Sequence, residues 1–509
     1  MADSFYITSP IYYVNDAPHI GHAYTSLACD VMARFNRLDG KQVMFLTGTD
    51  EHGQKVEKAA QLAGIPPKAF VDKVSQNFRD LCRTMNFSND DFIRTTEERH
   101  VRSVQALWTR LVEKGEIYLG KYAGWYAVSD EAFYGEDELT LRDGKRYGPS
   151  GKEVEWVEEP SYFFRLSAWR DRLLKFYADN PDFIAPDTRR NEVISFVSGE
   201  LRDLSVSRTT FKWGIPVPND PAHIMYVWID ALTNYITAAG FPDTESEAFK
   251  TFWPGMHMVG KDILRFHAVY WPAFLMAADI APPKRVFAHG WWTNEGQKIS
   301  KSLGNVIVPG ELVERYGLDP VRYFLLREVP FGQDGDFSKA AMVRRMNTDL
   351  ANDLGNLAQR TLSFIQKNCV GSLPVPGAFA EADEALLRQA KALLPEVRRL
   401  IEAQSFNRAL EHVWLTIGEA NRYIDAQAPW TLRKTDPARM ATVLYVLAET
   451  IRRLAILLQP FMPEAMGKML DQVAVPGGAR SFASYDTALA GGTALPAPQG
   501  IFPRFVEAT

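Results

Sequence analysis

Residues 5–53 read FYITSPIYYVNDAPHIGHAYTSLACDVMARFNRLDGKQVMFLTGTDEHG, and this stretch decides the fold. Its short apolar start, Phe5–Thr8, predicts a buried strand. From His22 onward, apolar side chains recur at helical spacing until Gly40, which predicts a helix and its end. Gln42–Leu46 then predicts a second strand. Strand, helix and strand in so short a stretch indicate a βαβ unit, so we expect an α/β fold with a Rossmann-like, doubly wound parallel sheet.

The rest of the chain differs in character from this unit. Residues 117–220 are rich in aromatic, glycine and acidic residues, which predicts small β-elements inserted into the α/β domain. After Asp336 apolar residues recur at helical spacing, and a chain of 509 residues has room for about three domains. We expect these segments: 1–116, first half of the α/β domain; 117–220, inserted connective domain; 221–297, second half of the α/β domain; 298–340, junction; 341–472, helical domain; 473–509, C-terminal tail.

Composition and charge exclude several classes of protein. The chain has 57 Lys and Arg against 62 Asp and Glu, which disfavours a generic nucleic-acid binder, so any contact with a polyanion must be local. The most membrane-like run, Ala268–Ala278, contains Pro272 and is too short to span a bilayer. Because Met1–Pro10 lacks the features of a signal or transit peptide, we expect a cytoplasmic protein without a membrane anchor.

Cysteine and histidine are too scattered for a metal or disulfide framework. The three cysteines, Cys29, Cys82 and Cys369, form no CxxC pair, which excludes a Cys-rich zinc knuckle. None of the nine histidines completes a metal-ligand cluster. We therefore expect no structural metal.

The first chemical motif is Pro18–His22, where the first strand passes into the first helix. The free N–H groups and positive dipole at a helix start attract anions, and this crevice is where open α/β sheets bind ligands. Gly21 lets a flat or anionic group come close, while His19 and His22 can donate hydrogen bonds to phosphoryl oxygens. The alternative interpretation is helix capping with a chance pair of histidines.

The second motif is Lys298–Asn305, which reads KISKSLGN. Two lysines spaced by small polar residues and followed by glycine make a cationic loop that can wrap a triphosphate. Alone, this motif is better explained as a solvated basic loop. The specific signal is the presence of both motifs on two turns of one α/β chain.

With both motifs described, the chain resembles the class I aminoacyl-tRNA synthetases. His19–His22 matches the first signature of that class, and Lys298–Ser302 matches the second with Ile299 where the class most often has methionine. Four longer segments resemble methionyl-tRNA synthetases closely: Thr8–Asn15, Thr47–Gly53, Tyr226–Tyr235 and Gly260–His267. The likeness covers nearly the whole chain.

The resemblance implies an ATP-dependent ligase that forms methionyl-adenylate and pyrophosphate, and then transfers methionine to the 2′-OH of the terminal adenosine of tRNA(Met). Mg²⁺ would accompany the nucleotide. The insertion carries Tyr122–Asp130 where many relatives have cysteines, so the resemblance is to the branch without structural zinc. His19 and His22 would contact phosphate oxygens, and Lys298 and Lys301 would contact the β- and γ-phosphates.

The resemblance also assigns residues to three binding sites. Further contacts to ATP would come from Gly21, Asp262, His289, Gly290 and Ser300. The methionine pocket would comprise Ile11, Tyr13, Asp50, Trp228, Ala231, Leu232, Tyr235, Ile263 and His267. Within it Asp50 would hold the ammonium group, and the aromatic residues suit a thioether, although each aromatic taken singly is better explained as core packing. The anticodon would contact Asn356, Arg360, Pro429 and Trp430.

Three alternatives compete with this interpretation. A class I synthetase for another apolar amino acid would share the chemistry. A tRNA-binding paralogue without catalysis should have lost the signature histidines and lysines, which are all present here. A nucleotidyltransferase with the same histidine motif leaves the helical C-terminal third unexplained. We also expect a monomer, since no oligonucleotide-binding domain follows the helical bundle.

Overall fold

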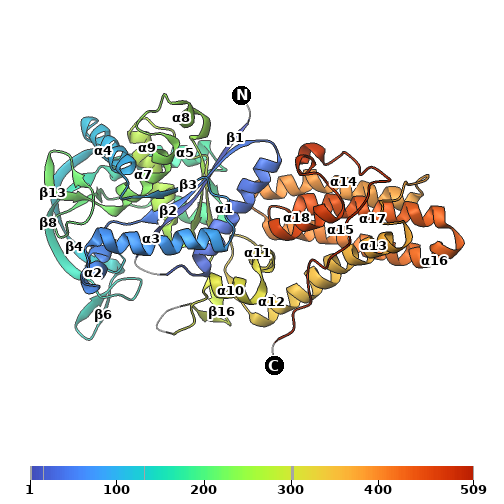
Figure 1. Cartoon of the computed structure of the whole chain (residues 1–509). Helices are drawn as coiled ribbons and strands as arrows, with labels where there is room; N and C mark the ends of the chain where they lie inside the picture. The colour runs from blue at the N-terminus through green and yellow to red at the C-terminus, as the bar shows by residue number, and fades with distance from the viewer. Residues whose placement is uncertain (1–2, 15–16, 131, 300–302, 508–509) are drawn as a thin grey trace.

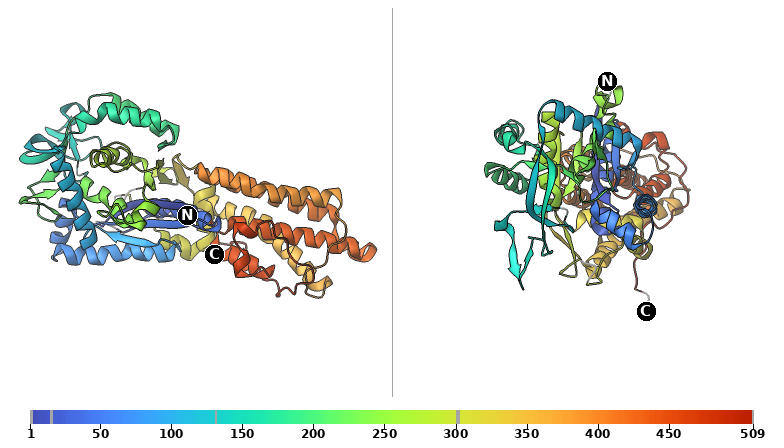
Figure 2. Two further views of the ribbon diagram at one scale, coloured as in Figure 1. Left: turned by 90° about the horizontal axis from the view of Figure 1, so that it is seen from above. Right: turned by 90° about the vertical axis from the view of Figure 1, so that its left-hand side faces the viewer.

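The computed structural model describes residues 3–14, 17–130, 132–299 and 303–507. The N-terminal part of the chain forms an α/β lobe, and the C-terminal part forms an elongated helical lobe that extends from one side of it (Figures 1 and 2). Within the described ranges, none of the helices combines the length and the apolar character that crossing a membrane requires.

The α/β lobe is built on a sheet that, in the described residues, has six strands in the order β3-β2-β1-β14-β15-β9, all parallel. The strand order changes direction beside β1, which has β2 on one side and β14 on the other, and such a switch point opens a crevice at the carboxyl ends of the strands. The expected doubly wound parallel sheet is confirmed. Its strands are β1 Ser4–Tyr13, β2 Gln42–Asp50, β3 Asp91–Arg94, β9 Ile184–Ala185, β14 Met256–Gly260 and β15 Arg285–His289.

Helices cover both faces of this sheet, so neighbouring strand residues alternate between two apolar cores. Ile7 and Phe45 pack with α1 (Ile20–Leu38) on one face. Tyr6 and Leu46 pack on the other face, in the core formed with three further helices. Burial on both faces explains why the strands are continuous apolar runs. The helices of the second face are α4 Glu98–Glu113, α7 Val227–Ala239 and α9 Trp271–Ala277.

The insertion forms a smaller antiparallel sheet with strand order β10-β8-β4-β5. Its strands are β4 Ile117–Ala127, β5 Ala132–Tyr134, β8 Glu155–Phe164 and β10 Leu204–Ser205, followed by a second small sheet of β11 Ser207–Arg208, β12 Pro216–Val217 and β13 Asp220–Met225. A hairpin, β6 Thr140–Arg142 and β7 Lys145–Tyr147, projects from it, and α5 Arg170–Asp179 and α6 Asp187–Ser198 follow. Strand β9 lies within 117–220 but pairs with β15, so this segment also supplies an edge strand of the main sheet.

A junction links the two lobes. It contains β16 Trp292–Asn294, β17 Gln297–Lys298, α10 Pro309–Tyr316, α11 Leu318–Arg327 and β18 Gly335–Phe337. The helical lobe comprises α12 Lys339–Arg345, a π-helical segment Met346–Gly355, α13 Asn356–Asn368, α14 Glu381–Glu402, α15 Phe406–Gln427, α16 Pro429–Thr435, α17 Pro437–Leu458 and α18 Pro463–Gln472. The C-terminal segment folds back on this lobe, since the Leu373 amide donates to the carbonyl of Thr493 at 2.8 Å and Tyr485 is buried.

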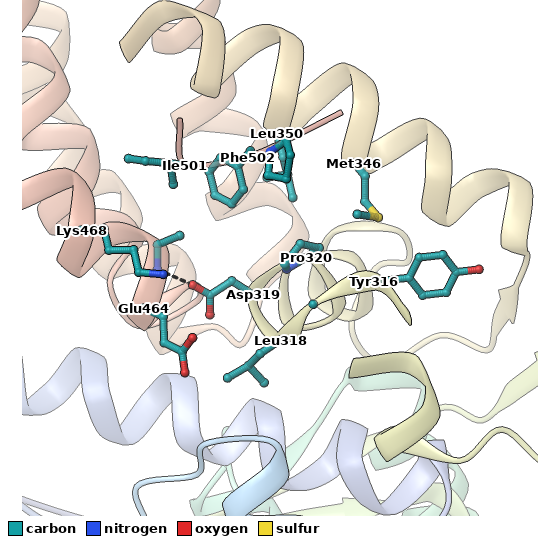
Figure 3. Close-up of a pocket in the computed structure, with 13 residues that line it drawn as sticks. Tyr316, Leu318, Asp319, Pro320, Met346, Leu350, Glu464, Lys468, Ile501 and Phe502 are labelled. Carbon is teal, nitrogen blue, oxygen red and sulfur yellow. Dashed lines mark hydrogen bonds between the residues drawn. The ribbon is translucent and has the colours of Figure 1, made fainter. Parts of the chain in front are cut away.

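A cavity of about 220 Å³ lies at the junction between α11, the π-helical segment, α18 and the C-terminal segment (Figure 3). Asp319 in its wall accepts a hydrogen bond from the amide of Ala465 at 2.6 Å and thereby caps the first turn of α18. Burial raises the pKa of Asp319 to about 6. None of the residues that line this cavity belongs to the two chemical motifs.

Candidate active site

The histidine motif forms the start of α1 and caps it. The backbone amide of Gly21 donates to Nδ1 of His19 at 3.0 Å, and the amide of His19 donates to Nδ1 of His22 at 3.0 Å. Burial lowers the pKa of His19, and burial together with the neighbouring His19 ring lowers that of His22, so both rings are neutral near pH 7. In a neutral ring whose Nδ1 accepts, the proton sits on Nε2, so each ring has Nε2–H as its donor.

Packing fixes the orientation of these rings. The His22 ring makes edge contacts with Tyr12 at 4.7 Å and Phe78 at 5.3 Å between ring centres, and the His19 and His22 rings lie 3.9 Å apart. A Cβ on Gly21 would lie 2.9 Å from Cε1 of His19, so glycine is needed for the His19 side chain to fold back over the helix start. The cap therefore determines the position and the tautomer of the two imidazoles.

Beside this helix start lies a cavity of about 480 Å³. His19 and Gly21 contribute to one wall and Lys298, from the second motif, to another, so the two motifs meet across one cavity as the sequence predicts. Ser300 and Lys301 lie outside the described residues. The lining residues are Ala17, Pro18, His19, Ile20, Gly21, His289, Gly290, Trp291, Trp292, Lys298, Ile299, Val306 and Val308.

The end of β15 forms the floor of the same cavity. The hydroxyl of Thr25 on α1 lies 2.6 Å from Nε2 of His289, whose Nδ1 lies 2.8 Å from the carbonyl of Gly290. With Nδ1 donating to that carbonyl, Nε2 accepts from Thr25, and burial lowers the pKa of His289 toward this neutral state. A Cβ on Gly290 would lie 2.3 Å from the carbonyl oxygen of Gln333, so only glycine allows the two backbones to approach so closely.

Asp262 lies at the rim of this region and is exposed. Its Oδ1 accepts a hydrogen bond from Nε1 of Trp291 at 3.1 Å, and the Lys261 ammonium lies 4.3 Å from the centre of the same Trp291 ring. Its negative charge raises the pKa of His19 and His289, against the larger effect of their burial. The Asp262 carboxylate therefore influences the pKa of both histidine rings in the cavity wall.

The predicted methionine residues fall into two groups. Ile11, Tyr13, Trp228 and Ala231 belong to one small apolar cluster, and Ile11 and Trp228 also pack against the core between α7 and the sheet. The Trp228 ring stacks on Phe266 with ring centres 3.4 Å apart. Leu232 instead packs in the core between α7 and the sheet, with Ile263 partly buried against that core.

Tyr235 and His267 form a hydrogen-bonded pair behind this cluster. The Tyr235 hydroxyl lies 2.7 Å from Nε2 of His267, and Nδ1 of His267 lies 2.9 Å from the carbonyl of Ile263. Burial lowers the pKa of His267 to about 4, partly opposed by the bond to Ile263 and the charge of Asp262. His267 is thus neutral, and its Nε2 accepts a hydrogen bond from the Tyr235 hydroxyl. The lone pairs of the phenol oxygen remain for other donors.

Asp50 ends β2, paired in register with Tyr13 of β1, and is 4% exposed. The next residues are held by groups that the motifs do not single out: Glu51 by Arg94, and His52 by Asp230. Asp230 lies within the quoted segment Tyr226–Tyr235 but has no role assigned from the sequence. The signal for it is a carboxylate in the first turn of a helix that has no other charged residue, since a buried carboxylate must have partners.

The predicted anticodon residues lie on α13 and α16 of the helical lobe. Asn356, exposed, begins α13, and Arg360 follows one turn later. The Arg360 guanidinium lies 5.4 Å from the centre of the Trp430 ring and 2.5 Å from a carboxylate oxygen of Asp425. Trp430 is 42% exposed, whereas Pro429 is buried at the start of α16. Arg360 and Trp430 thus share one surface.

Two signature turns across a cavity at the switch point of a parallel sheet define a class I tRNA synthetase. A family model described as tRNA synthetases class I (M) matches residues 5–362, and one described as the anticodon binding domain of methionyl tRNA ligase matches residues 373–509. The chain belongs to the methionine–tRNA ligase family of this class. Among the described residues there is no group of three or more histidines, cysteines or carboxylates placed to hold a metal ion.

Similar proteins support this assignment over the full length. The methionine–tRNA ligase of Brucella suis is 60% identical over 509 residues, 99% of each chain. That of Mesorhizobium japonicum is 57% identical, covering 99% of this chain and 98% of the other. The solved structure of Mycobacterium tuberculosis methionyl-tRNA synthetase in complex with methionyl-adenylate has a TM-score of 0.97 at 56% identity, covering 99% of this chain and 100% of that chain.

Proposed function

We propose that this cavity is where the chain activates L-methionine with ATP. The observation that supports it is that His19, Gly21, His289, Gly290 and Lys298 line one cavity of about 480 Å³ at the switch point of the sheet. A cavity of that size suits a nucleotide, and its rings, glycines and lysine match the parts of ATP. The methionine pocket is the adjoining apolar cluster of Ile11, Tyr13, Trp228 and Ala231.

In the first step the methionine carboxylate attacks the α-phosphorus of ATP and pyrophosphate leaves. The nucleophile is already ionised, so the chain supplies position and charge rather than a base. The Nε2–H groups of His19 and His22 donate to phosphate oxygens as negative charge develops there. Lys298 and Lys301 contact the β- and γ-phosphates, and Asp50 binds the methionine ammonium.

Mg²⁺ is expected to enter with ATP, held by phosphate oxygens and water, which suits a cation that keeps much of its hydration shell. In the second step the 2′-OH of the terminal adenosine of tRNA(Met) attacks the carbonyl carbon of methionyl-adenylate, the product of the first step, and AMP leaves. Asn356, Arg360, Pro429 and Trp430 hold the anticodon while this occurs. An enzyme that charges tRNA acts where translation takes place, so the proposed location is the cytoplasm.

The test is amino-acid-dependent ATP–pyrophosphate exchange with the wild type and Lys301→Ala. We expect methionine to support exchange far better than cysteine or leucine. Lys301→Ala should slow exchange by about two to three orders of magnitude, because that is the usual cost of removing one group that stabilises charge in the transition state, while methionine affinity is kept. Faster exchange with leucine or cysteine would refute the substrate, and an equal loss of methionine binding in Lys301→Ala would refute the role of the lysine.

A further inference from the structure

The turn that joins β2 to α2 (Gln54–Leu62) buries three ionisable side chains in a row. Asp50 is 4% exposed, Glu51 0% and His52 7%. Burying charged or polar groups costs free energy unless each has partners. A turn built in this way is therefore held by its partners, and those partners determine where Asp50 points.

Glu51 is satisfied entirely within the protein. Its Oε1 accepts from Nε of Arg94 at 2.6 Å and from the Thr49 hydroxyl at 2.7 Å, and its Oε2 accepts from Nη2 of Arg94 at 3.0 Å and from the Thr96 hydroxyl at 2.6 Å. A carboxylate with this set of donors anchors the turn to the end of β3 and is not offered to a ligand. This leaves Asp50 as the carboxylate of the turn on the side of the apolar cluster.

His52, the third buried residue of the turn, is anchored by a buried carboxylate, Asp230, that bridges His52 and His100. Nδ1 of His52 lies 2.6 Å from Oδ2 of Asp230, and Nε2 of His100 lies 2.8 Å from Oδ1 of the same residue. Asp230 and His100 are both 0% exposed. Burial alone would raise the pKa of Asp230, but the two histidines outweigh burial and hold that pKa at about 2, so Asp230 is ionised and accepts from both rings.

This bridge connects three walls of the apolar cluster. Asp230 precedes Ala231 and follows Trp228 by two positions on α7. The Tyr13 hydroxyl, from the end of β1, donates to the carbonyl of His52 at 3.2 Å. His100, on α4, ties the whole arrangement to the helix behind it. The β1 end, the Asp50 turn and α7 are thus joined through His52 and Asp230.

We propose that Asp230 is a positioning residue for amino-acid binding: by bridging His52 and His100 it fixes the turn that carries Asp50 against the helix that carries Trp228 and Ala231. The proposal rests on the proposed function, because it takes Asp50 as the group that binds the ammonium. It predicts that the bridge sets the affinity for methionine and leaves that for ATP unchanged, since the ATP cavity is built from α1, β15 and the second motif.

The first test is Asp230→Asn, which keeps the shape but removes the charge and one acceptor. We expect the KM for methionine in pyrophosphate exchange to rise about 10- to 100-fold, as loss of a charged hydrogen bond implies, while the KM for ATP and kcat at saturating methionine change by less than about threefold. The control is Asp383→Asn, a buried carboxylate in the helical lobe that binds Arg439 and Tyr423. It should lower the melting temperature without changing the KM for methionine.

A second pair of variants separates the hydrogen bond from packing. In His100→Gln, the side-chain amide can replace the Nε2–H donor to Asp230, whereas the similarly sized side chain of His100→Met has no donor. His100→Gln should retain a KM for methionine near that of the wild type, and His100→Met should raise it about tenfold or more. This pair also serves if Asp230→Asn does not fold.

Three results would each overturn the positioning role of Asp230. They are an unchanged KM for methionine in Asp230→Asn, an equal rise in the KM for ATP in that variant, and equal effects of His100→Gln and His100→Met on the KM for methionine. Asp50→Asn tests the underlying site separately. If Asp50→Asn binds methionine normally, the proposed pocket is wrong. If Asp50→Asn no longer binds methionine while Asp230→Asn binds it normally, only the positioning role of Asp230 is wrong.

Discussion

At the start of α1, single residues show how capping and chemistry are combined. The sequence allows two interpretations of His19 and His22, as helix caps or as phosphate ligands; the geometry shows the capping and leaves Nε2–H of each ring for the proposed phosphate contact. Because each Nδ1 accepts a backbone amide, each proton is placed on Nε2. The cap therefore prepares two neutral donors whose direction is fixed before any ligand binds, which is the preorganisation that electrostatic stabilisation requires.

His267 gives a prediction about pH. Its pKa in the folded protein, about 4, lies below the ordinary value of 6.5, so the stability it contributes is fully present above pH 6.5 and is lost as the pH falls toward 4. At pH 5 the loss amounts to about 2 kcal/mol. We expect His267→Gln, which cannot titrate, to lose about 2 kcal/mol less than the wild type between pH 7 and pH 5 in urea unfolding. Equal pH dependence in both proteins would show that His267 is not buried in its neutral form.

The site residues that can be predicted from the sequence lie in local motifs, whereas those that cannot are brought together by tertiary packing. His19, Gly21 and Lys298 lie in short motifs in which the residue types themselves, two imidazoles, a glycine and two lysines, indicate the chemistry. Asp230 and His100 are 130 positions apart, and only the packing of α4 against α7 brings them together. A partner brought close by tertiary packing leaves no local pattern, although a lone carboxylate in a helix without other charges indicates that a partner exists.

At the scale of elements, the βαβ unit was predictable because its periodicities are local, and β9 was not. Ile184–Ala185 is a strand of two residues in an apolar run too short to predict a strand, and it joins the main sheet through β15. Its position depends on the long connection through the insertion, which the sequence pattern does not encode. The segment 117–220 therefore contributes both a separate small sheet and an edge of the large one.

The surface shared by α13 and α16 carries the next prediction. Trp430 is exposed and has the Arg360 guanidinium beside its ring. Stacking of a base on an exposed aromatic is worth about 1–3 kcal/mol, so Trp430→Ala should lower kcat/KM for tRNA in aminoacylation by about 10- to 100-fold. Pyrophosphate exchange should stay unchanged, because the proposed methionine and ATP sites lie in the other lobe.

The control for this variant is Leu415→Ala, which removes an exposed apolar side chain from the neighbouring helix α15. It should affect neither aminoacylation nor exchange. If Trp430→Ala lowered both activities together, Trp430 would be a structural residue of the bundle rather than a tRNA contact.

At the scale of the whole molecule, one apolar core runs from the sheet face under α1 through the junction into the helical lobe. Arg322 on α11 lies inside it and is fully buried. Its Nη2 donates to Oδ2 of Asp30 on α1 at 2.7 Å and to the carbonyl of Pro460 at 2.8 Å, and its Nε donates to the carbonyl of Phe461 at 2.9 Å. Nη1 donates to the carbonyl of Met85 at the end of α3 (Pro67–Thr84) at 3.0 Å. A single guanidinium thus joins the helix that begins with the histidine motif to the turn between α17 and α18.

Removing this guanidinium should loosen the two lobes from each other. Arg322→Met leaves Asp30 and several carbonyl groups buried without that donor, which costs about 3–5 kcal/mol. The comparison is Arg398→Met, which breaks the bond between Arg398 on α14 and Asp39 at the end of α1. That pair also crosses between the lobes, but the Arg398 side chain is 36% exposed, so its loss should cost at most about 1 kcal/mol. Urea unfolding of both variants checks the difference. If Arg322→Met proved no less stable than Arg398→Met, then burial of the guanidinium is not what holds the lobes together, and apolar packing along the shared core would be sufficient.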